Sequence, residues 1–373
     1  MKKQICTRCV MDNTSDETII FKENGTCNYC NYALSRKDQV YFPNSMGNKK
    51  LKEMISLLKK EGKGKKYDCL MGISGGLDSA YLAYLGAEKW GLRILAVHID
   101  DGFNTDVAAQ NIEKLCNKYN NIDLVIEKPN EKQYMDIIKS FFRAGVPSLA
   151  LPQDNVLQAY LNMYAKKFNL KYFLSGANFA LESILQRGNA HIAADKVHIQ
   201  DIHKKFGEIP LTSLPLITIF ERYIGQRYIS GIKTLRPLDY IEYNRKNAIQ
   251  ELSKNVGFNY YGGKHYESIF TKFVQVYYLP NKFNVDKRNS HYSSLIISNQ
   301  MSRDEALIEL EKPLFEEEQM EKDIVLILDK IGMNKDEFER LMKEKGRSHS
   351  DYKVSALIKY KNIARKFRRI LGE

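Results

Sequence analysis

The sequence has no apolar run long enough to cross a membrane. Crossing takes roughly 20 consecutive apolar residues, and the best stretch, residues 211–220, is short and interrupted by Pro215. The N-terminus, Met-Lys-Lys-Gln-Ile-Cys, is not followed by the apolar core of a signal peptide. We therefore expect a cytoplasmic protein without a membrane span, in which cysteine thiols stay reduced.

Acidic residues are few relative to basic ones. The 373 residues include 57 Lys and Arg against 45 Asp and Glu, which gives a net charge of +12. A composition with 43% apolar and 27% charged residues excludes wholesale disorder. The basic excess suggests nucleic acid, an anionic substrate or an acidic surface as a binding partner. Much of this excess lies in residues 343–373, where the spacing of apolar residues over 357–371 predicts a solvated amphipathic helix.

Four of the six cysteines are clustered near the N-terminus, in two CxxC pairs: Cys6, Cys9, Cys27 and Cys30. This spacing is typical of a zinc knuckle with four thiolate ligands, and an iron–sulfur cluster is the alternative. A segment of this length buries little surface by itself, so a bound metal would supply the missing stability. Four protein ligands leave no open position, so we expect a structural Zn²⁺ site.

Strands and helices alternate after this knuckle. We predict strands at 67–73, 92–99, 123–127 and 171–174, and helices at 51–60, 78–90, 105–119, 131–142, 154–168 and 179–186. This alternation predicts an α/β fold, a parallel sheet covered on both faces. We divide the chain into a zinc knuckle (1–40), a helical linker (41–66), the sheet domain (67–240) and a helical C-terminal region (241–373) that binds substrate or a partner. Within these, residues 188–240 are interpreted as a lid or substrate loop.

A glycine-rich loop joins the first strand to the first helix of the sheet domain. Its sequence is Ser-Gly-Gly-Leu-Asp-Ser, residues 74–79. Ligands of parallel sheets bind at this carboxyl edge, and glycines let backbone amides and the helix N-terminus approach an anion closely. The loop lacks the lysine of the GxxxxGK[ST] phosphate loop. The sequence therefore predicts a phosphate site of a different kind.

This hexapeptide resembles the PP-loop of ATP pyrophosphatases, which cleave ATP between the α- and β-phosphates. The resemblance implies that Ser74, Gly75, Gly76, Asp78 and Ser79 hold the pyrophosphate. Asp100 and Asp101, at the end of the second strand, resemble the nucleoside-side position, and for Asp100 a helix cap or turn acid is the equal alternative. Gly176 and Glu182 lie in a second stretch, SGANFALE, which resembles the Gly-x-Asn…Glu segment of NAD synthetase-like members. There Glu182 would hold Mg²⁺ together with Asp78.

Two basic stretches follow in the C-terminal region. Lys264 and His265 lie in a Gly-Gly-Lys-His loop, and Lys287 and Arg288 form a second basic pair. Such cations would neutralise the charge that develops on departing pyrophosphate, and a solvated charge run is the alternative reading. We expect residues 261–288, like 188–215, to act as a lid that excludes water.

Together, the cysteine knuckle, SGGLDS, SGANFALES and GGKH…DKR resemble the N-acetyl sugar amidotransferases of surface-polysaccharide biosynthesis, the WbpG- and PseA-like LPS biosynthesis proteins. The resemblance implies conversion of an N-acetyl group on a nucleotide-linked sugar to an acetamidino group, in O-antigen (LPS) or flagellin-glycan biosynthesis. ATP and Mg²⁺ would adenylate the amide oxygen, and ammonia would then displace AMP. The resemblance also implies a HisH-like glutaminase and a HisF-like subunit as partners that supply the ammonia. A class II glutaminase needs Cys as the first residue of the mature chain, whereas residue 2 is Lys2, and no Cys-His-Glu glutaminase domain is recognisable.

The main alternative is a tRNA-thiolating PP-loop enzyme, which would account equally well for the net charge and the knuckle. Such enzymes carry sulfur on a reactive cysteine or an iron–sulfur cluster. Only Cys69 and Cys116 remain outside the knuckle, and neither lies in a glycine-rich or basic loop. A nucleic-acid partner is therefore disfavoured. A third reading, without catalysis, is a zinc-stabilised nucleotide-binding module.

Overall fold

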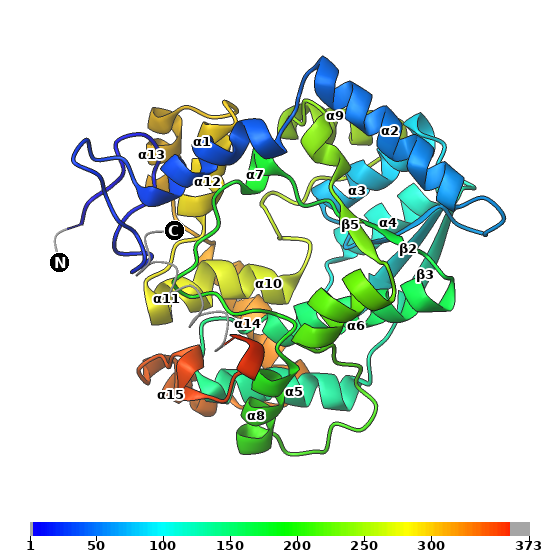
Figure 1. Ribbon diagram of the computed structural model, residues 1–373. Coiled ribbons are helices and arrows are strands. Elements are labelled where there is room, and N and C mark those ends of the chain that lie inside the picture. The colour runs from blue at the N-terminus through cyan, green and yellow to red at the C-terminus, as the bar shows by residue number, and fades with distance from the viewer. Residues whose placement is uncertain (1–2, 359–373) are drawn as a thin grey trace.

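A five-stranded parallel sheet forms the centre of one half of the molecule. The computed structural model describes residues 3–358 (Figure 1). The strands are β1 (Cys69–Gly72), β2 (Ile94–Ile99), β3 (Ile122–Glu127), β4 (Tyr172–Leu174) and β5 (Lys233–Leu235), in the order β3-β2-β1-β4-β5. All neighbouring strands are parallel. The chain moves outward from β1 to β3 and then returns to the other side of β1, so a switch point, where ligands bind in such sheets, lies between β1 and β4.

Helices cover both faces of this sheet, as expected for an α/β fold. One layer contains α2 (Ser45–Glu61), α3 (Leu77–Tyr84) with its π-helical continuation (Leu85–Lys89), α4 (Asp106–Lys118) and α9 (Arg245–Val256). The opposite face is covered by α6 (Leu151–Lys167), which contacts β1. Alternation along β1 explains the two layers: Met71 packs with the first layer, and Leu70 packs with Leu161 of α6.

The lower half of Figure 1 is a helical body with an aromatic core. It contains α5 (Glu131–Ala144), α8 (Lys196–Phe206), α10 (Ile269–Phe273), the π-turn Val274–Tyr278, α11 (Leu279–Phe283), α14 (Glu317–Ile331), α15 (Lys335–Lys343) and the 3-10 turn His349–Asp351. Phe142 lies at its centre, with its ring centroid 5.9 Å from that of Phe273 and 6.2 Å from that of Phe338. This core connects α5, which comes from the sheet half of the sequence, with helices of the C-terminal region.

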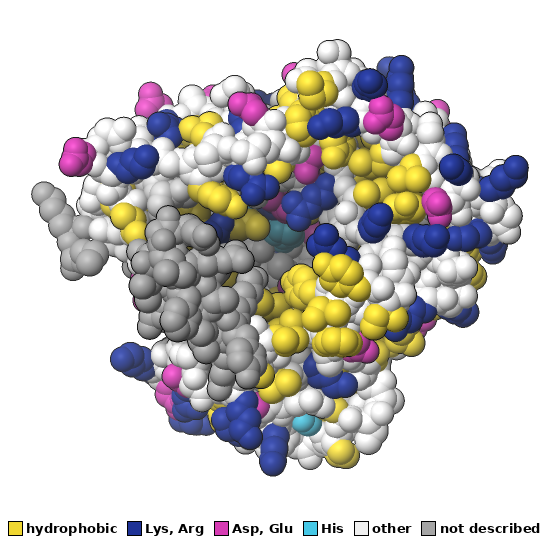
Figure 2. All heavy atoms as spheres, viewed as in Figure 1, with side chains coloured by type: hydrophobic (Ala, Val, Ile, Leu, Met, Phe, Trp, Pro, Cys, Tyr) yellow, Lys and Arg dark blue, Asp and Glu magenta, His cyan; other side chains and the backbone are white. Residues whose placement is uncertain are grey.

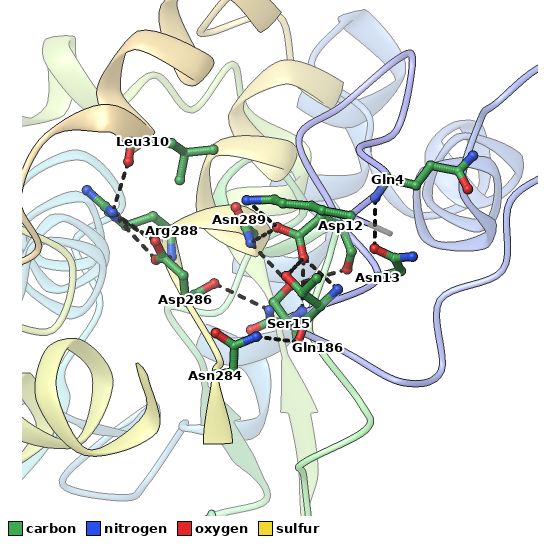
Figure 3. A network of polar contacts seen from close by, with 12 residues as sticks. Gln4, Asp12, Asn13, Ser15, Gln186, Asn284, Asp286, Arg288, Asn289 and Leu310 are labelled. Atoms are coloured by element: carbon green, nitrogen blue, oxygen red, sulfur yellow. Dashed lines mark hydrogen bonds and ion pairs between the residues drawn. The ribbon is translucent and has the colours of Figure 1, made fainter. Parts of the chain in front are cut away.

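The N-terminal cysteine segment packs on the C-terminal region. It consists of isolated antiparallel bridges, followed by α1 (Asn28–Val40), which contacts α12 (Arg288–Ile297). Asn289 of α12 donates hydrogen bonds to Asp12 and Ser15 (Figure 3). Arg303, which begins α13 (Arg303–Glu311), donates to the carbonyls of Cys6 and Cys9. The N-terminal segment is therefore joined to α12 and α13 through polar contacts that are buried or partly buried.

The four predicted strands and the predicted helices are confirmed, with differences of a few residues at their ends. The prediction of a loop over 188–240 is wrong. This segment contains α8, a π-helical stretch (Glu221–Ile229), β5 and a 3-10 turn (Pro237–Tyr240). Strand β5 escaped prediction because it has three residues and its side chains are largely exposed; it is specified by pairing with β4. The helix predicted over 357–371 lies beyond Ile358, outside the described residues. No helix within 3–358 is long and apolar enough to span a membrane.

Candidate active site

The loop between β1 and α3 is shaped by close contact with α4. Gly75 has a φ of +76°, and a Cβ there would lie 2.4 Å from the carbonyl oxygen of Ala108. Only glycine meets both conditions. Gly76 precedes α3 with no side-chain cap, and the Leu77 amide donates to the hydroxyl of Tyr261, 2.8 Å away. The loop thus presents an open helix N-terminus, the position at which anions bind.

This loop faces a cavity of about 360 Å³. Figure 2 shows the molecule hollowed near its middle, with Lys and Arg side chains at the edge and His and acidic side chains deeper in. The walls come from the loop, from the segment 176–182 that follows β4, from residues 260–267, and from the start of α12. Of the residues singled out in the sequence, the cavity brings together Ser74, Gly76, Asp78, Ser79, Gly176, Glu182, Lys264, His265, Lys287 and Arg288. Segments that are far apart in the sequence therefore meet at one site.

Two carboxylates and one ammonium group form a charged centre beside the loop. Lys264 donates to Glu182 at 2.8 Å, and Asp78 accepts a hydrogen bond from the hydroxyl of Tyr243 at 2.6 Å. Desolvation raises the pKa of Asp78; the Lys264 charge opposes that rise and the Glu182 charge adds to it. Desolvation also acts to raise the pKa of Glu182, but Lys264 outweighs it and holds that pKa below its usual range. Two acids this close to an anion site have the oxygen ligands that Mg²⁺ prefers, so the residues fit this ion.

Gly176 keeps the second segment close to the loop. A Cβ at Gly176 would lie 3.0 Å from the carbonyl carbon of Asp78 and 3.1 Å from the amide nitrogen of Ser79. The helix that follows, α7 (Phe179–Glu182), is capped by Asn178, whose side chain also donates to Asp78 at 3.3 Å. This short helix thereby fixes where Glu182 stands relative to Asp78.

The two residues of the predicted basic pair differ in their surroundings. Lys287 lines the cavity, and its ammonium group has no hydrogen bond or ion pair with any residue in 3–358. Desolvation lowers its pKa, with a small opposing effect from Asp16. The guanidinium of Arg288 instead binds Asp286 and the carbonyl of Leu310 (Figure 3). It also donates to the carbonyls of Glu309 and Lys312. The free cation of this pair is Lys287, because every nitrogen of Arg288 that can donate is engaged within the protein.

The structure also shows cavity residues that sequence reasoning missed. These are Arg245, Tyr260, Tyr261, Glu267 and His291. His291 lies one helical turn after Lys287 on α12, a spacing that could have identified it, and its ring centroid is 6.1 Å from that of His265. Desolvation and the surrounding cations Lys264, His265, Lys287 and Arg245 lower the pKa of His291 well below its usual value. Its imidazole is therefore neutral at physiological pH.

Asp100 and Gly75 do not line the cavity. Asp100 forms an ion pair with Lys128 at 3.2 Å, and its neighbour Asp101 is buried with Tyr134 and Gln153 as hydrogen-bond donors. The expectation that Asp100 contacts the nucleotide is not supported by this placement, since the chain turns after β2 and carries the side chain toward β3. Gly75 acts through its backbone, which packs on α4.

The four N-terminal cysteines form a single compact cluster. Their sulfur atoms all lie within 4.8 Å of one another, and all four residues are fully buried. Cys6 and Cys30 are 3.7 Å apart at sulfur, and Cys9 and Cys27 are 3.6 Å apart. A single tetrahedral ion with metal–sulfur bonds of about 2.3 Å places its ligands about 3.8 Å apart. The donor set thus fits one metal ion, whereas a cubane cluster spreads its thiolates over separate iron atoms.

Comparison with known proteins identifies the C-terminal part of the chain. Residues 267–367 match the family described as LPS biosynthesis protein WbpG-like, C-terminal domain. The chain is also 28% identical over 172 residues to an uncharacterized protein of Methanocaldococcus jannaschii, in a match that covers 46% of this chain and 58% of the archaeal one. The matched segment thus spans just over half the length of that relative.

Three solved structures are similar at low identity. An NH3-dependent NAD synthetase from Campylobacter jejuni shares 16% identity over 43% of this chain and 72% of its own, with a TM-score of 0.30. An NMN synthetase from Francisella tularensis shares 15% over 68% and 93%, with a TM-score of 0.33. A U34-tRNA thiolase from Methanococcus maripaludis with its 4Fe–4S cluster shares 14% over 80% and 87%, with a TM-score of 0.32. At these scores the likeness extends to neither substrate nor mechanism.

Proposed function

From the match of residues 267–367 to the family described as LPS biosynthesis protein WbpG-like, C-terminal domain, we propose that the chain is an ATP-dependent N-acetyl sugar amidotransferase. Its substrate is an N-acetyl group on a nucleotide-linked sugar, and its product is the corresponding acetamidine. The observation that carries the proposal is the shared cavity, in which the loop 74–79 faces Lys264 and Lys287 of the C-terminal region.

The chemistry requires activation because an amide carbonyl is a poor electrophile. In the first step the acetamido oxygen attacks the α-phosphorus of ATP, and pyrophosphate leaves. In the second step ammonia attacks the imidate carbon and AMP departs with the former amide oxygen, which leaves the acetamidino group as its amidinium cation. The enzyme must bind both anions and stabilise the negative charge that develops on pyrophosphate.

The loop is suited to bind the pyrophosphate portion of ATP. The open N-terminus of α3 and the hydroxyls of Ser74 and Ser79 line this end of the cavity. Asp78 and Glu182 would hold Mg²⁺, which when bound supplies positive charge to the phosphate oxygens. Lys264 and Lys287 add cations that need no rearrangement when pyrophosphate leaves, and Lys287 has no protein partner to give up among the described residues.

Aromatic side chains would protect the adenylated intermediate from water. Tyr260, Tyr261, Tyr266 and Tyr292 line the cavity, and Leu295 adds an apolar surface. Water that reached the intermediate would return it to the starting amide and waste the ATP, so exclusion of water decides the yield of amidine.

We further propose that the nitrogen comes from separate subunits, a HisH-like glutaminase and a HisF-like protein. The resemblance to the N-acetyl sugar amidotransferases supports these partners. For the cysteine cluster we propose Zn²⁺, as its donor atoms suit a closed structural site that holds the N-terminal segment on α12 and α13.

The cavity disfavours the tRNA-thiolating alternative. No cysteine within residues 3–358 lines it. Cys69 is fully buried in β1 and Cys116 lies on α4, and burial raises the pKa of each thiol, that of Cys116 to about 11. Thiols held neutral in this way are poor nucleophiles.

The proposal is tested by incubating the protein with ATP, Mg²⁺, an ammonium salt and a panel of N-acetyl sugar nucleotides. We expect AMP, pyrophosphate and a sugar product in which an oxygen has been replaced by NH, detected by mass spectrometry. ADP and phosphate as products, or AMP without any change in the sugar, would refute the assignment.

A further inference from the structure

A second, smaller cavity adjoins the active site from the side of the N-terminal segment. It has a volume of about 210 Å³ and lies between α1, α7 and the 3-10 turn Pro237–Tyr240. Glu182 lines both this cavity and the larger one that contains the loop 74–79. The two cavities therefore adjoin at Glu182.

The smaller cavity leads inward from the surface. Tyr32 and Leu185, at its rim, are 51% and 57% exposed, and the guanidinium groups of Arg36 and Arg236 also belong to exposed residues. Toward Glu182 the lining becomes buried: Asn178 is 2% exposed, Phe179 8% and Asp239 7%. A small molecule that entered at the rim would reach Glu182 without passing the loop or the ATP phosphates.

The lining favours a small molecule that is polar and carries no negative charge. Two carboxylates (Glu182 and Asp239) and two guanidinium groups (Arg36 and Arg236) give the wall no net charge. Ser183 also lines it, and its buried hydroxyl has no hydrogen-bond partner in the described chain. Buried hydroxyl groups normally make at least one hydrogen bond, so the Ser183 hydroxyl indicates a binding position for a small polar molecule. Pyrophosphate and ATP suit the main cavity better, because it holds the N-terminus of α3 and the ammonium group of Lys287, which has no partner among the described residues.

We propose that this cavity is the entrance through which ammonia reaches the adenylated substrate, passing beside Glu182 into the active site. The inference rests on the proposed function, because it needs a nitrogen nucleophile. Glu182 stays in place, held by Lys264 at 2.8 Å, so ammonia passes beside this residue where it lines both cavities. A separate entrance lets ammonia arrive while ATP and the sugar nucleotide still block the main opening and exclude water.

The test narrows the entrance without touching the main cavity. Ser183→Leu fills the entrance from the end of α7, and Val40→Phe fills it from the end of α1. Because the two substitutions lie on different elements, the test can still be made if one variant does not fold. Ser35→Leu is the matched control, since Ser35 lies on α1 with an exposed side chain outside the lining. The full chain is assayed with ATP, Mg²⁺, the sugar nucleotide and ammonium chloride.

Each filled variant is expected to raise the KM for ammonia by about tenfold or more, with AMP formation and the KM for ATP unchanged. AMP should then form with less amidine, as the intermediate is lost to water. Ser35→Leu should behave like the unaltered protein. An unchanged KM for ammonia in a folded Ser183→Leu or Val40→Phe variant would overturn the entrance while leaving the amidotransferase assignment intact. Absence of amidine with the unaltered protein would instead refute the function, and with it the route.

Discussion

Replacement of Asp78 by Asn separates the chemistry of the loop from the stability of the fold. The Asn side chain has nearly the same shape and still accepts a hydrogen bond from Tyr243, whose hydroxyl lies 2.6 Å from the carboxylate. A weaker acceptor costs about 0.5–1.5 kcal/mol. Against this, the substitution removes a desolvated charge, so we expect the free energy of unfolding to change by no more than about 1 kcal/mol.

The effect of Asp78→Asn on the free energy of unfolding depends on pH. The pKa of Asp78 is raised in the folded protein, whereas in the unfolded chain it is about 3.9. The folded state therefore binds more protons between these two values, and the unaltered protein loses stability as pH rises through that window. Asp78→Asn lacks this loss. In the absence of added Mg²⁺, its stability relative to the unaltered protein should thus improve from pH 4 upward until the folded pKa is passed, measured by thermal melting.

Turnover should respond in the opposite way. Loss of one positioned charge at a site of developing charge costs about 2.7–4 kcal/mol, so we expect pyrophosphate release to fall roughly a hundred- to a thousandfold. Asp106→Asn is the matched control, because Asp106 stands in the first turn of α4 as Asp78 stands in that of α3 but is exposed. Full pyrophosphate release by Asp78→Asn, or an equal loss in Asp106→Asn, would refute the role given to the loop.

Further substitutions test other parts of the account. Cys6→Ser should lower the metal content measured by mass spectrometry and destabilise the protein by several kcal/mol, since the cluster loses one of four ligands; retention of one metal ion per chain would argue against the closed site. Lys287→Met should reduce pyrophosphate release about tenfold or more with little change in melting temperature. Arg288→Ala should instead lower the melting temperature, because it leaves the Asp286 carboxylate without its partner. The reverse pattern would make Arg288 the cation that binds pyrophosphate and Lys287 the structural residue. Tyr261→Phe removes the acceptor of the Leu77 amide and should destabilise the protein by about 0.5–1.5 kcal/mol, and an unchanged stability in denaturant unfolding would contradict this.

The sheet and its loop could be predicted from sequence because their signals are local. A buried strand, a glycine-rich turn and a helix occupy consecutive residues, so the loop 74–79 and its place at the carboxyl edge follow from the order of residues alone. The cysteine cluster is similar, since the spacing within each CxxC pair already limits the possible geometry. Strand β5 carries no such signal, as it is defined by its hydrogen bonds to β4.

Contacts between distant segments could not be predicted in this way. Tyr243 lies 165 residues from Asp78 in sequence yet donates to its carboxylate, and no local pattern announces that contact. Asp100 illustrates a second limit of prediction from sequence. It follows β2 at the predicted edge of the sheet, but the direction of the next turn determines that Asp101 is buried while Asp100 pairs with Lys128. Arg288 lines the cavity, but its guanidinium is also bound by carbonyls at the end of α13, contacts that no local pattern announces.

The most direct test of the account follows the acetamido oxygen itself. A sugar nucleotide with an isotopically labelled acetamido oxygen is incubated with the protein, ATP, Mg²⁺ and ammonia, and the AMP is examined by mass spectrometry. Attack of that oxygen on the α-phosphorus predicts that the label appears in AMP, one atom for each amidine formed. Amidine formed alongside unlabelled AMP would contradict adenylation of the amide and with it the central claim.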